Sequence, residues 1–371
     1  RDSVTHCKGK IMKIVITGGH FTPAWATMTE LLLRGHTIVY FGRQTSMEGD
    51  RGLSFEASSL WGSRVRFVSM VTARLQRRFT IYTIPSLLKF PAAFLQALFE
   101  LLAISPDRVC SFGGSLALPV VLAAWILRVP IILHEQTLSP GIANRFLSRF
   151  SRRVAVSFPE TASLFGSKAV VIGNPVRKEI FQTRPSSKEV TAFLNRADKP
   201  IVYVAGGSQG SHAINLLVEQ SLERLLMRFC VLHAVGTSTK TGDLPRLIKE
   251  QRNLSLPLQH RYLPVSSVGH ADIGGVLHAA RAVVGRSGAN TAWEIALLGK
   301  PAVLFPLAIS AEGEQKKHAR WLVREGLAEV ASDDMTPTAF VEMVATQAKQ
   351  HPKHLDLPKD AGRKLADLVE E

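Results

Sequence analysis

Short apolar runs and longer amphipathic stretches alternate along the first half of the chain. The runs are rich in Val and Ile, as buried strands are, and they lie at 13–17, 37–41, 108–112, 130–133, 153–157 and 169–172. The stretches between them, such as 24–34 and 115–127, have the apolar spacing of helices. Strands that alternate with helices predict a parallel sheet built from βαβ units.

The same alternation starts again after a polar, proline-containing passage at 182–200. Strand-like runs recur at 201–205, 230–235, 282–285 and 302–305, and helices are expected at 211–228, 290–298 and 315–325. Two such series predict an α/β chain with two doubly wound parallel-sheet domains, which we place at 12–178 and 179–371. Residues 1–11 are expected to be an extension without a fold, because Met12 can serve as the start of translation.

The segment 83–105 is apolar nearly all round. A membrane-spanning helix needs about 20 predominantly apolar residues, so the length of this segment is borderline. Pro85 and Pro91, together with the charges of Lys89 and Glu100, argue against a span. Two interpretations remain open: a helix packed on the sheet with one face touching lipid, or a plain helix of the core. A basic cluster precedes the segment, formed by Arg74, Arg77 and Arg78.

The composition is typical of a globular protein of about two domains, with 371 residues, 46% of them hydrophobic and 20% charged. The three cysteines (Cys7, Cys110 and Cys230) form neither a disulfide framework nor a zinc motif. This usage favours a reducing, cytoplasmic compartment. The first residues contain no apolar signal core, so no export signal is expected.

The net charge of +15 is concentrated in the first half. Residues 1–178 contain 22 Lys and Arg against 9 Asp and Glu, a balance of +13, while residues 179–371 contain 23 against 21, or +2. Such an excess favours an acidic partner, either an anionic membrane or a phosphorylated substrate. Nucleic acid is disfavoured, because no basic run is interleaved with aromatics and no nucleic-acid-binding motif occurs. A basic but merely solvated surface is the alternative.

Four strand-like runs end in turns of glycine and serine that lead into helices. They are "KIVITGGH", "VCSFGGSLALP", "IVYVAGGSQGSHAIN" and "AVVGRSGANTAWE". In open α/β sheets, ligands bind beyond the carboxyl ends of the strands, and the amino ends of helices attract phosphate. Two turns in each half would meet across a cleft between the domains, which predicts a site for a nucleotide phosphate.

The type of nucleotide can be narrowed. The turn "AGGSQG" has alanine at the first fingerprint position, and the next strand ends without Asp or Glu, so NAD is disfavoured. A Gly-Lys-Ser/Thr phosphate loop is also missing, which excludes ATP bound in that manner. Glu294 lies near the start of a predicted helix, where its carboxylate can accept hydrogen bonds from two ribose hydroxyls. A glutamate that only stabilises the amino end of the helix is the alternative.

Five longer stretches resemble the MurG family, within glycosyltransferase family 28. They are "TGGHFTPA", "HEQTLSPGIANR", "GNPVRKEIF", "GGSQGSHAIN" and "RSGANTAWEIALLGKPAVLFP", in this order. This family moves N-acetylglucosamine from UDP-N-acetylglucosamine onto undecaprenyl-pyrophosphoryl-N-acetylmuramoyl-pentapeptide (lipid I), which makes lipid II in peptidoglycan synthesis. The resemblance covers about residues 12–330.

The resemblance implies a GT-B architecture of two Rossmann-like domains. The first domain would handle the acceptor and an anionic membrane surface, and the second would bind the UDP-sugar. The helical tail after residue 335 would return to the first domain. The implied location is peripheral, on the cytoplasmic face of the cell membrane.

The family's donor contacts fall on residues of both halves. Thr17, Gly18 and Gly19 would lie near the sugar and the diphosphate, and Arg177 and Ser208 would hold phosphate. The nucleoside side of the site would be formed by Leu263, Ala289, Asn290, Thr291, Ala292, Trp293 and Glu294, with Glu294 on the ribose. Gln315 would bind sugar hydroxyls. This chain has Thr137 where the family has an asparagine that touches the donor sugar, and Ser115 where the family has tyrosine.

The implied reaction inverts the anomeric carbon, so a base must take the proton of the acceptor's 4-hydroxyl. His20 follows the glycines at a helix entrance, and an imidazole with a reference pKa of about 6.5 suits proton transfer at neutral pH. Glu135 is the alternative base, with His20 preferred.

No cofactor is implied, and no Asp-x-Asp motif is present to hold a metal. A helix amino end and Arg177 would stabilise the leaving UDP instead. Two other functions remain open: another GT-B transferase, for example one that glucosylates diacylglycerol, and a membrane-associated nucleotide-sugar binder without activity.

Overall fold

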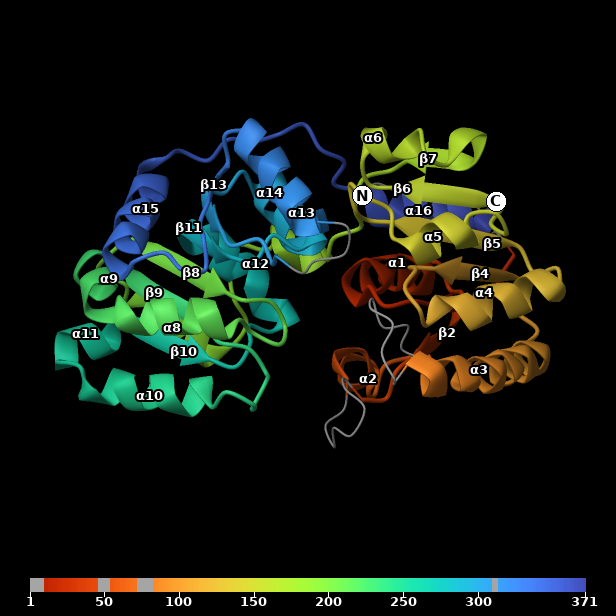
Figure 1. Ribbon diagram of the computed structural model, residues 1–371, viewed down its shortest axis with the longest axis horizontal. Helices are drawn as coiled ribbons and strands as arrows, with labels where there is room; N and C mark the ends of the chain where they lie inside the picture. The colour runs from red at the N-terminus through yellow and green to blue at the C-terminus, as the bar shows by residue number, and fades with distance from the viewer. Residues whose placement is uncertain (1–9, 46–53, 72–82, 309–312) are drawn as a thin grey trace, which may run out of the picture. The chain divides into compact units, whose positions relative to one another are not determined.

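The computed structural model describes residues 10–45, 54–71, 83–308 and 313–371. The cluster of Arg74, Arg77 and Arg78 and residues 1–9 of the expected extension lie outside these residues. The chain divides into two compact units, which Figure 1 shows with their elements labelled. The first unit comprises the chain up to Pro175 together with Asp360–Glu371, and the second comprises Val176–Lys359.

Seven parallel strands form the sheet of the first unit, in the order β3-β2-β1-β4-β5-β6-β7. They are β1 (Lys13–Thr17), β2 (Thr37–Gly42), β3 (Arg66–Ser69), β4 (Arg108–Ser111), β5 (Ile131–Glu135), β6 (Arg153–Val156) and β7 (Ala169–Val171). The helices of this unit are α1 (Phe21–Leu33), α2 (Phe55–Leu60), α3 (Thr83–Ile104), α4 (Ala117–Ile126), α5 (Ile142–Leu147), α6 (Pro159–Ala162), η1 (Gly166–Lys168) and α16 (Ala361–Glu370).

Alternate residues of these strands pack on opposite faces of the sheet, as the period of a strand requires. Val15 of β1 packs in a cluster with residues of α3, α4 and α5. Its neighbours Ile14 and Ile16 pack in a second cluster with residues of α1 and α16. Both faces of the sheet are therefore covered by helices, which confirms the predicted doubly wound arrangement.

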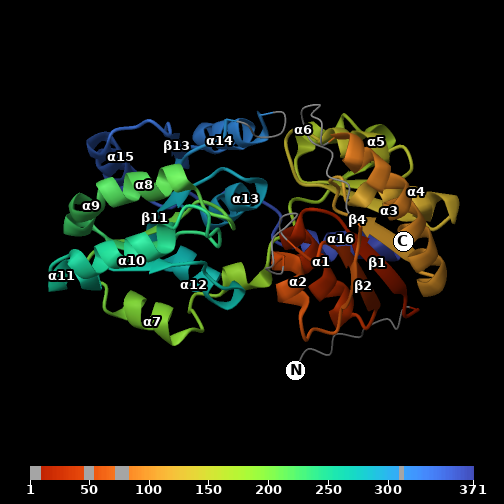
Figure 2. The same cartoon turned by 60° about the horizontal axis from the view of Figure 1, so that its bottom comes forward.

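Six parallel strands form the sheet of the second unit, in the order β10-β9-β8-β11-β12-β13. They are β8 (Ile201–Ala205), β9 (Cys230–Ala234), β10 (Tyr262–Val265), β11 (Ala280–Gly285), β12 (Ala302–Leu304) and β13 (Ala328–Val330). The helices are η2 (Lys178–Phe181), α7 (Lys188–Asn195), α8 (His212–Gln220), α9 (Leu222–Arg228), α10 (Asp243–Asn253), α11 (Leu256–His260), α12 (His270–Ala279), α13 (Ala289–Leu298), α14 (Glu314–Arg324) and α15 (Pro337–Lys349). Figure 2 shows α8, α9 and α15 on one side of this sheet and α7 and α12 on the other.

Three strands, β3, β10 and β13, were not predicted from the sequence. Each lies at the edge of its sheet. Most residues of β3 and β13 are at least partly exposed, so the apolar signal of these strands is weak. Strand β10 is mostly buried but short, and it contains Pro264, which an edge strand tolerates because it needs fewer backbone donors. The predicted helix at 211–228 is also interrupted, and Ser221 separates α8 from α9.

The boundary between the units lies at Pro175, whereas the sequence placed it at 178. The short helix η2 packs on α12 of the second unit. This contact is close, because a Cβ added at Gly274 would lie 2.0 Å from the carbonyl oxygen of Glu179. The preceding residue Arg177 is held in the second unit by an ion pair with Glu294.

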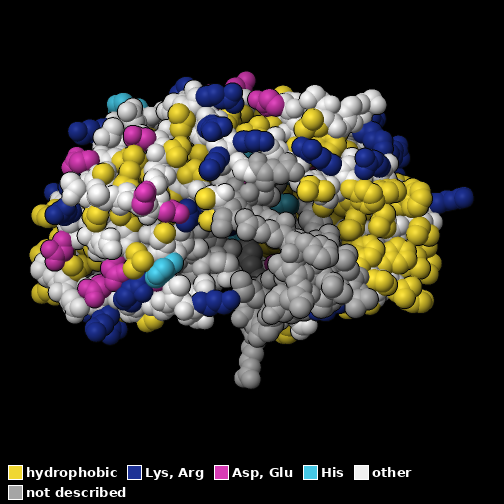
Figure 3. Space-filling view, viewed as in Figure 1, with side chains coloured by type: hydrophobic (Ala, Val, Ile, Leu, Met, Phe, Trp, Pro, Cys, Tyr) yellow, Lys and Arg dark blue, Asp and Glu magenta, His cyan; other side chains and the backbone are white. Residues whose placement is uncertain are grey.

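Helix α3 packs with one face only. Ala93, Ala97 and Leu101 are buried against the sheet, while Phe99 and Leu102 are 66% and 52% exposed. Figure 3 shows hydrophobic side chains gathered over α3 and α4. No helix in the described part of the chain combines the length and the apolarity that crossing a membrane requires. The structure thus favours the helix with one face on the sheet over the fully buried core helix.

The last helix, α16, packs on α1 in the first unit. Its residues Leu365 and Val369 are completely buried. Arg34, which follows α1, donates a hydrogen bond to Glu370 at 2.7 Å. His36 accepts a hydrogen bond at Nδ1 from the backbone N–H of Met12, so its Nε2 carries a proton and donates to Glu370 at 2.6 Å.

We expect Leu365→Ala to destabilise the first unit, because it leaves a cavity between α16 and α1. The expected cost is about 2 to 5 kcal/mol in the free energy of unfolding. Lys364→Ala, at the neighbouring partly exposed position, is the matched control and should change stability by about 0.5 kcal/mol or less. Urea unfolding, with hydrogen exchange of α1 amides, measures both variants. Equal midpoints would contradict this account of α16.

Candidate active site

Two loops interlock at the carboxyl edge of the first sheet. The first follows Thr17, the last residue of β1, and contains Gly18 and Gly19, and the second follows β4. The N–H of Gly19 donates to the carbonyl oxygen of Gly113 at 3.0 Å. Gly18 has a φ of +140°, and a Cβ there would lie 2.7 Å from the backbone carbon of Phe112. Glycine is therefore required at position 18 by the close approach of the two loops, whereas a Cβ at Gly19 would have no atom within 4 Å.

His20 is oriented by the second of these loops. Its Nδ1 lies 2.7 Å from the carbonyl oxygen of Phe112. A carbonyl oxygen only accepts, so Nδ1 carries the proton and Nε2 keeps its lone pair. His20 occupies the N-cap position of α1 but makes no side-chain cap. The side chain of His20 therefore does not cap this helix.

His134 lies near His20. Its ring packs on that of Phe112 with centroids 5.4 Å apart. Burial lowers the pKa of His134 to about 3, and the nearby His20 contributes to the lowering. His134 is therefore neutral at physiological pH. It supports the loops as a packed side chain and adds no charge beside His20.

The side chain of Glu135 is buried and bound on both oxygens. Oε1 accepts hydrogen bonds from the backbone N–H and the hydroxyl of Thr137, at 2.9 and 2.7 Å. Oε2 accepts from the side-chain amide of Asn144 at 2.7 Å. Only 2% of Glu135 is exposed. This carboxylate ties the residues after β5 to α5, and Thr137 is one of the groups it holds.

In the second unit, the glycine-rich turn after β8 also lies very close to a neighbouring loop, the one that follows β9. Gly210 has a φ of +84°, and a Cβ there would lie 2.1 Å from the carbonyl oxygen of Val235. Ser208 is exposed at the tip of this turn. Its carbonyl oxygen accepts a hydrogen bond from the N–H of Thr237 at 3.0 Å. The turn leads into α8, whose first backbone N–H groups are suited to an anion.

Arg177 and Glu294 form an ion pair with Nη2 2.9 Å from Oε1, and both side chains are nearly buried. Nη1 of Arg177 also lies 3.2 Å from Nδ1 of His270. Burial and the charge of Arg177 lower the pKa of His270 to about 4, so the neutral ring accepts this hydrogen bond. The structure thus brings together two residues that the sequence assigned separately to phosphate and to ribose.

Glu294 lies in the second turn of α13, which begins at Ala289. The helix dipole acts mainly on the first turn, so the ion pair with Arg177, and not the helix end, accounts for the position of this carboxylate. Asn290 and Thr291 are partly exposed, whereas Ala289, Ala292 and Trp293 are buried.

Two further residues predicted for the site are Leu263 and Gln315. Leu263 is buried within β10. Gln315, at the start of α14, accepts a hydrogen bond at Oε1 from the N–H of Leu307 at 3.0 Å. Its carbonyl oxygen accepts from the hydroxyl of Ser287 at 2.8 Å. Gln315 therefore links the residues after β11 and β12.

No group of three or more His, Cys, Asp or Glu side chains suited to a metal occurs among the described residues. Asp333 pairs with Arg286 at 2.8 Å. Arg286 also donates to the carbonyl oxygen of Phe305 at 3.0 Å and to the hydroxyl of Ser211 at 2.7 Å. The sequence did not predict these contacts of Arg286, although Arg286 belongs to a stretch that carried the family resemblance.

Both units match known family domains. Residues 12–156 match the glycosyltransferase family 28 N-terminal domain, and residues 201–371 match the glycosyltransferase family 28 C-terminal domain. A relative in Treponema denticola, named UDP-N-acetylglucosamine--N-acetylmuramyl-(pentapeptide) pyrophosphoryl-undecaprenol N-acetylglucosamine transferase, is 34% identical over 337 residues, 88% of this chain and 85% of the relative. The protein of the same name in Clostridium kluyveri is 30% identical over 371 residues, 96% of this chain and 99% of the relative.

Solved structures show the same fold. MurG of Acinetobacter baumannii has a TM-score of 0.63 at 23% identity, covering 97% of this chain and 99% of its own. The UDP-GlcNAc 2-epimerase of Methanocaldococcus jannaschii has the same TM-score at 13% identity, covering 97% of this chain and 100% of its own. A transferase and an epimerase share this fold, so the fold does not decide the activity. On its two matched domains and its nearly full-length relatives, the chain belongs to glycosyltransferase family 28.

Proposed function

We propose that this chain transfers N-acetylglucosamine from UDP-N-acetylglucosamine to the 4-hydroxyl of the N-acetylmuramoyl residue of lipid I, which forms lipid II. The observation that carries this proposal is the nearly full-length similarity to transferases named for that reaction. The site supports it with an oriented histidine in the first unit. The second unit adds an exposed serine turn before a helix and a nearly buried carboxylate that suits a ribose.

In the proposed reaction, the acceptor oxygen forms a bond to the anomeric carbon as the bond from that carbon to the diphosphate breaks. Nε2 of His20 takes the proton of the 4-hydroxyl, because Nδ1 is already protonated toward Phe112. Glu135 is less suited to this role, since three donors already engage its carboxylate. The electrons of the broken bond leave with UDP.

The second unit would bind the donor. The N–H groups at the start of α8 and the side chain of Ser208 would face the diphosphate and stabilise its growing charge. Arg177 contacts Oε1 of Glu294, and Oε2 would accept from the ribose hydroxyls. Arg177 would thereby orient the ribose acceptor as well as add positive charge to the phosphate side of the site.

The first unit would associate with an anionic membrane surface, where a lipid-linked acceptor resides. Large apolar side chains on α3, α4 and α5 are exposed; they are Leu95, Phe99, Leu102, Trp125, Ile126, Ile142 and Phe146. Exposed arginines accompany them, among them Arg145 and Arg149. Apolar side chains beside basic ones are the combination that binds lipid interfaces.

A direct assay tests the reaction. Purified protein is incubated with labelled UDP-N-acetylglucosamine and a short-chain lipid I analogue, and the product is scored as lipid-linked disaccharide. Transfer to diacylglycerol instead would identify another GT-B transferase. Binding of the nucleotide sugar without transfer to either acceptor would identify a binding protein without activity.

We expect Glu294→Ala to weaken UDP binding, because it removes the ribose acceptor and leaves Arg177 without its carboxylate. Loss of a charged hydrogen-bond partner costs about 1.5 to 3 kcal/mol, or roughly one to two decades in affinity. Calorimetric titration with UDP measures the effect, and circular dichroism checks that the variant is folded. Glu294→Gln keeps an acceptor oxygen and should lose less. Wild-type affinity in the folded alanine variant would show that the nucleoside pocket lies elsewhere.

We expect His20→Ala to lower turnover by roughly 10² to 10⁴, the usual contribution of a general base, with UDP affinity nearly unchanged. Glu135→Gln is the matched variant. Asn144 can turn its amide to place Oδ1, which has no hydrogen-bond partner, toward the new NH₂ group. We expect this variant to keep turnover within about tenfold. Near-normal turnover in His20→Ala together with inactive Glu135→Gln would assign the proton to the glutamate.

We expect binding to anionic vesicles to exceed binding to neutral vesicles and to fall as salt rises. The double variant Phe99→Ser/Trp125→Ser should bind such vesicles more weakly, because it removes exposed apolar area from α3 and α4. Leu256→Ser is the matched control, since Leu256 is 69% exposed but lies in the second unit. Vesicle sedimentation measures all three proteins. Equal loss in the control and in the double variant would refute the proposed membrane surface.

A further inference from the structure

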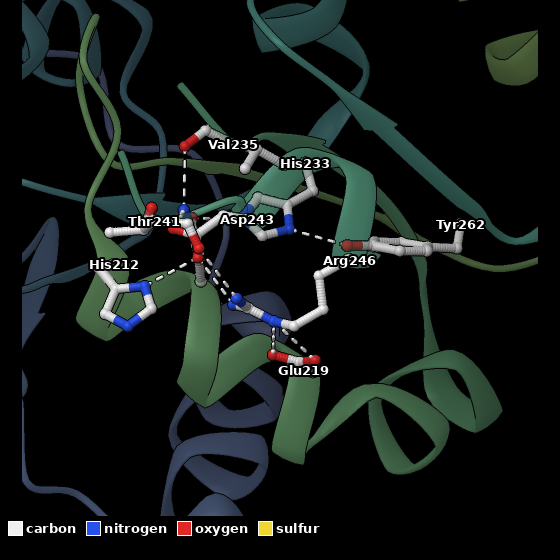
Figure 4. Close-up of polar contacts among 9 residues, drawn as sticks. His212, Glu219, His233, Val235, Thr241, Asp243, Arg246 and Tyr262 are labelled. Atoms are coloured by element: carbon white, nitrogen blue, oxygen red, sulfur yellow. Dashed lines mark hydrogen bonds and ion pairs between the residues drawn. The ribbon is translucent and has the colours of Figure 1, made fainter. Parts of the chain in front are cut away.

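A connected set of polar side chains joins helices and strands of the second unit (Figure 4). Its members come from four elements of the second unit: His212, Asn215 and Glu219 of α8, His233 of β9, Asp243 and Arg246 of α10, and Tyr262 of β10. None of them belongs to the site predicted from the sequence.

The amide of Asn215 is at the centre of this set and is 1% exposed. Its Nδ2 donates to the carbonyl oxygen of Val235 at 3.0 Å and to Oδ2 of Asp243 at 2.8 Å. Its Oδ1 accepts from Nε2 of His233 at 3.0 Å, while Nδ1 of His233 accepts from the hydroxyl of Tyr262 at 2.9 Å. The opposite amide orientation would place Oδ1 against two acceptors, so the orientation of Asn215 is fixed.

Asp243 is a fixed anion at one end of this arrangement. Burial would raise its pKa, but hydrogen bonds from Asn215, Thr241, Arg246 and His212 outweigh burial and lower the pKa to about 2. Arg246 is held in turn by Glu219, whose two oxygens lie 3.0 and 2.9 Å from Nε. The acceptor that Asn215 binds is therefore charged and well anchored.

The two acceptors of Asn215 lie at opposite ends of the loop between β9 and α10. Val235 precedes residues 236–242 and Asp243 follows them. One side-chain amide thus clasps both ends of this loop to α8. Thr237 comes only two residues after Val235, so the hydrogen bond at Val235 also restrains Thr237.

This loop in turn holds the turn of Ser208. The N–H and the hydroxyl of Thr237 donate to the carbonyl oxygen of Ser208, at 3.0 and 3.1 Å. A Cβ at Gly236 would lie 2.3 Å from the backbone of Gly210, so the two segments are in direct backbone contact. Displacement of residues 236–242 would therefore displace Ser208.

We propose that Asn215 is a positioning residue for the diphosphate of the nucleotide sugar, which acts by clasping residues 236–242 against the turn of Ser208. The inference rests on the proposed function, because it presumes that the turn at 206–211 receives the diphosphate. It assigns to Asn215 no contact with the ligand. Loss of the clasp affects the phosphate side of the ligand and leaves the nucleoside side, held by α13, in place.

The test compares UDP with uridine, which lacks the diphosphate. In Asn215→Ser, we expect UDP affinity to fall about tenfold while uridine affinity stays within about twofold. A tenfold fall corresponds to the loss of one hydrogen bond to the charged diphosphate. KM for UDP-N-acetylglucosamine should rise by a similar factor, with kcat within about threefold. Thr237→Val, an exposed substitution that removes one donor to Ser208, should give the same selective loss at about threefold.

Tyr262→Phe is the control, because it breaks the same set of side chains on the side away from Ser208. It should lower Tm while both affinities stay at the wild-type value. A parallel fall of UDP and uridine affinity in Asn215→Ser, or unchanged binding of both in Thr237→Val, would overturn the positioning role. Wild-type protein that binds neither UDP nor uridine would instead overturn the proposed donor, and the role of Asn215 with it.

Discussion

Close approach between neighbouring loops is the constraint on which the candidate site residues of each unit depend. In the first unit Gly18 lies against Phe112, and in the second Gly210 lies against Val235, at distances that leave no room for a Cβ. Both glycines also have positive φ, which side chains rarely adopt. The positions of His20 and Ser208 follow from these contacts, because each residue is hydrogen-bonded to a neighbouring loop.

Buried carboxylates hold the loops around these contacts. Glu135 and Asp243 each accept three or more hydrogen bonds and join segments that are separate in the sequence. A buried charge is tolerated only where donors surround it, so each carboxylate requires the arrangement it stabilises. Glu294 differs, because the guanidinium of Arg177 contacts only one of its oxygens. This difference is consistent with the proposed role of Glu294 as a ligand-binding residue, whereas Glu135 and Asp243 hold the loops in place.

The two halves of the chain differ in charge and in exposed apolar surface, which agrees with separate binding of acceptor and donor. The first half of the chain has a charge balance of +13, and its helices α3 and α4 expose large apolar side chains. The second half is nearly neutral in balance and contains the buried polar arrangement around Asn215. A lipid-linked acceptor and a nucleotide sugar are ligands that suit these two different surfaces.

The order of apolar runs was enough to predict the fold class, the central strands and some of the helices that cover them, but not α7 or α12. Their patterns are strong because both faces of a parallel sheet are buried. The edge strands β3 and β13 escaped this reasoning because most of their residues are at least partly exposed, and β10 escaped it because it is a short strand that contains Pro264. The boundary at Pro175 also depended on packing, because the contact of η2 with α12 cannot be deduced from the sequence.

For the site, the sequence identified residue types and their turns but not their partners. It singled out His20, Glu135, Arg177 and Glu294, yet the ion pair of Arg177 with Glu294 spans 117 positions, and no local pattern encodes such a pairing. Asn215 looked like an ordinary helix residue, and only the folded chain places its amide between Val235 and Asp243. The sequence by itself determined which groups the site has. The tertiary structure decided which of them are bound to one another, because hydrogen bonds between distant segments exist only once the sheets have brought those segments together.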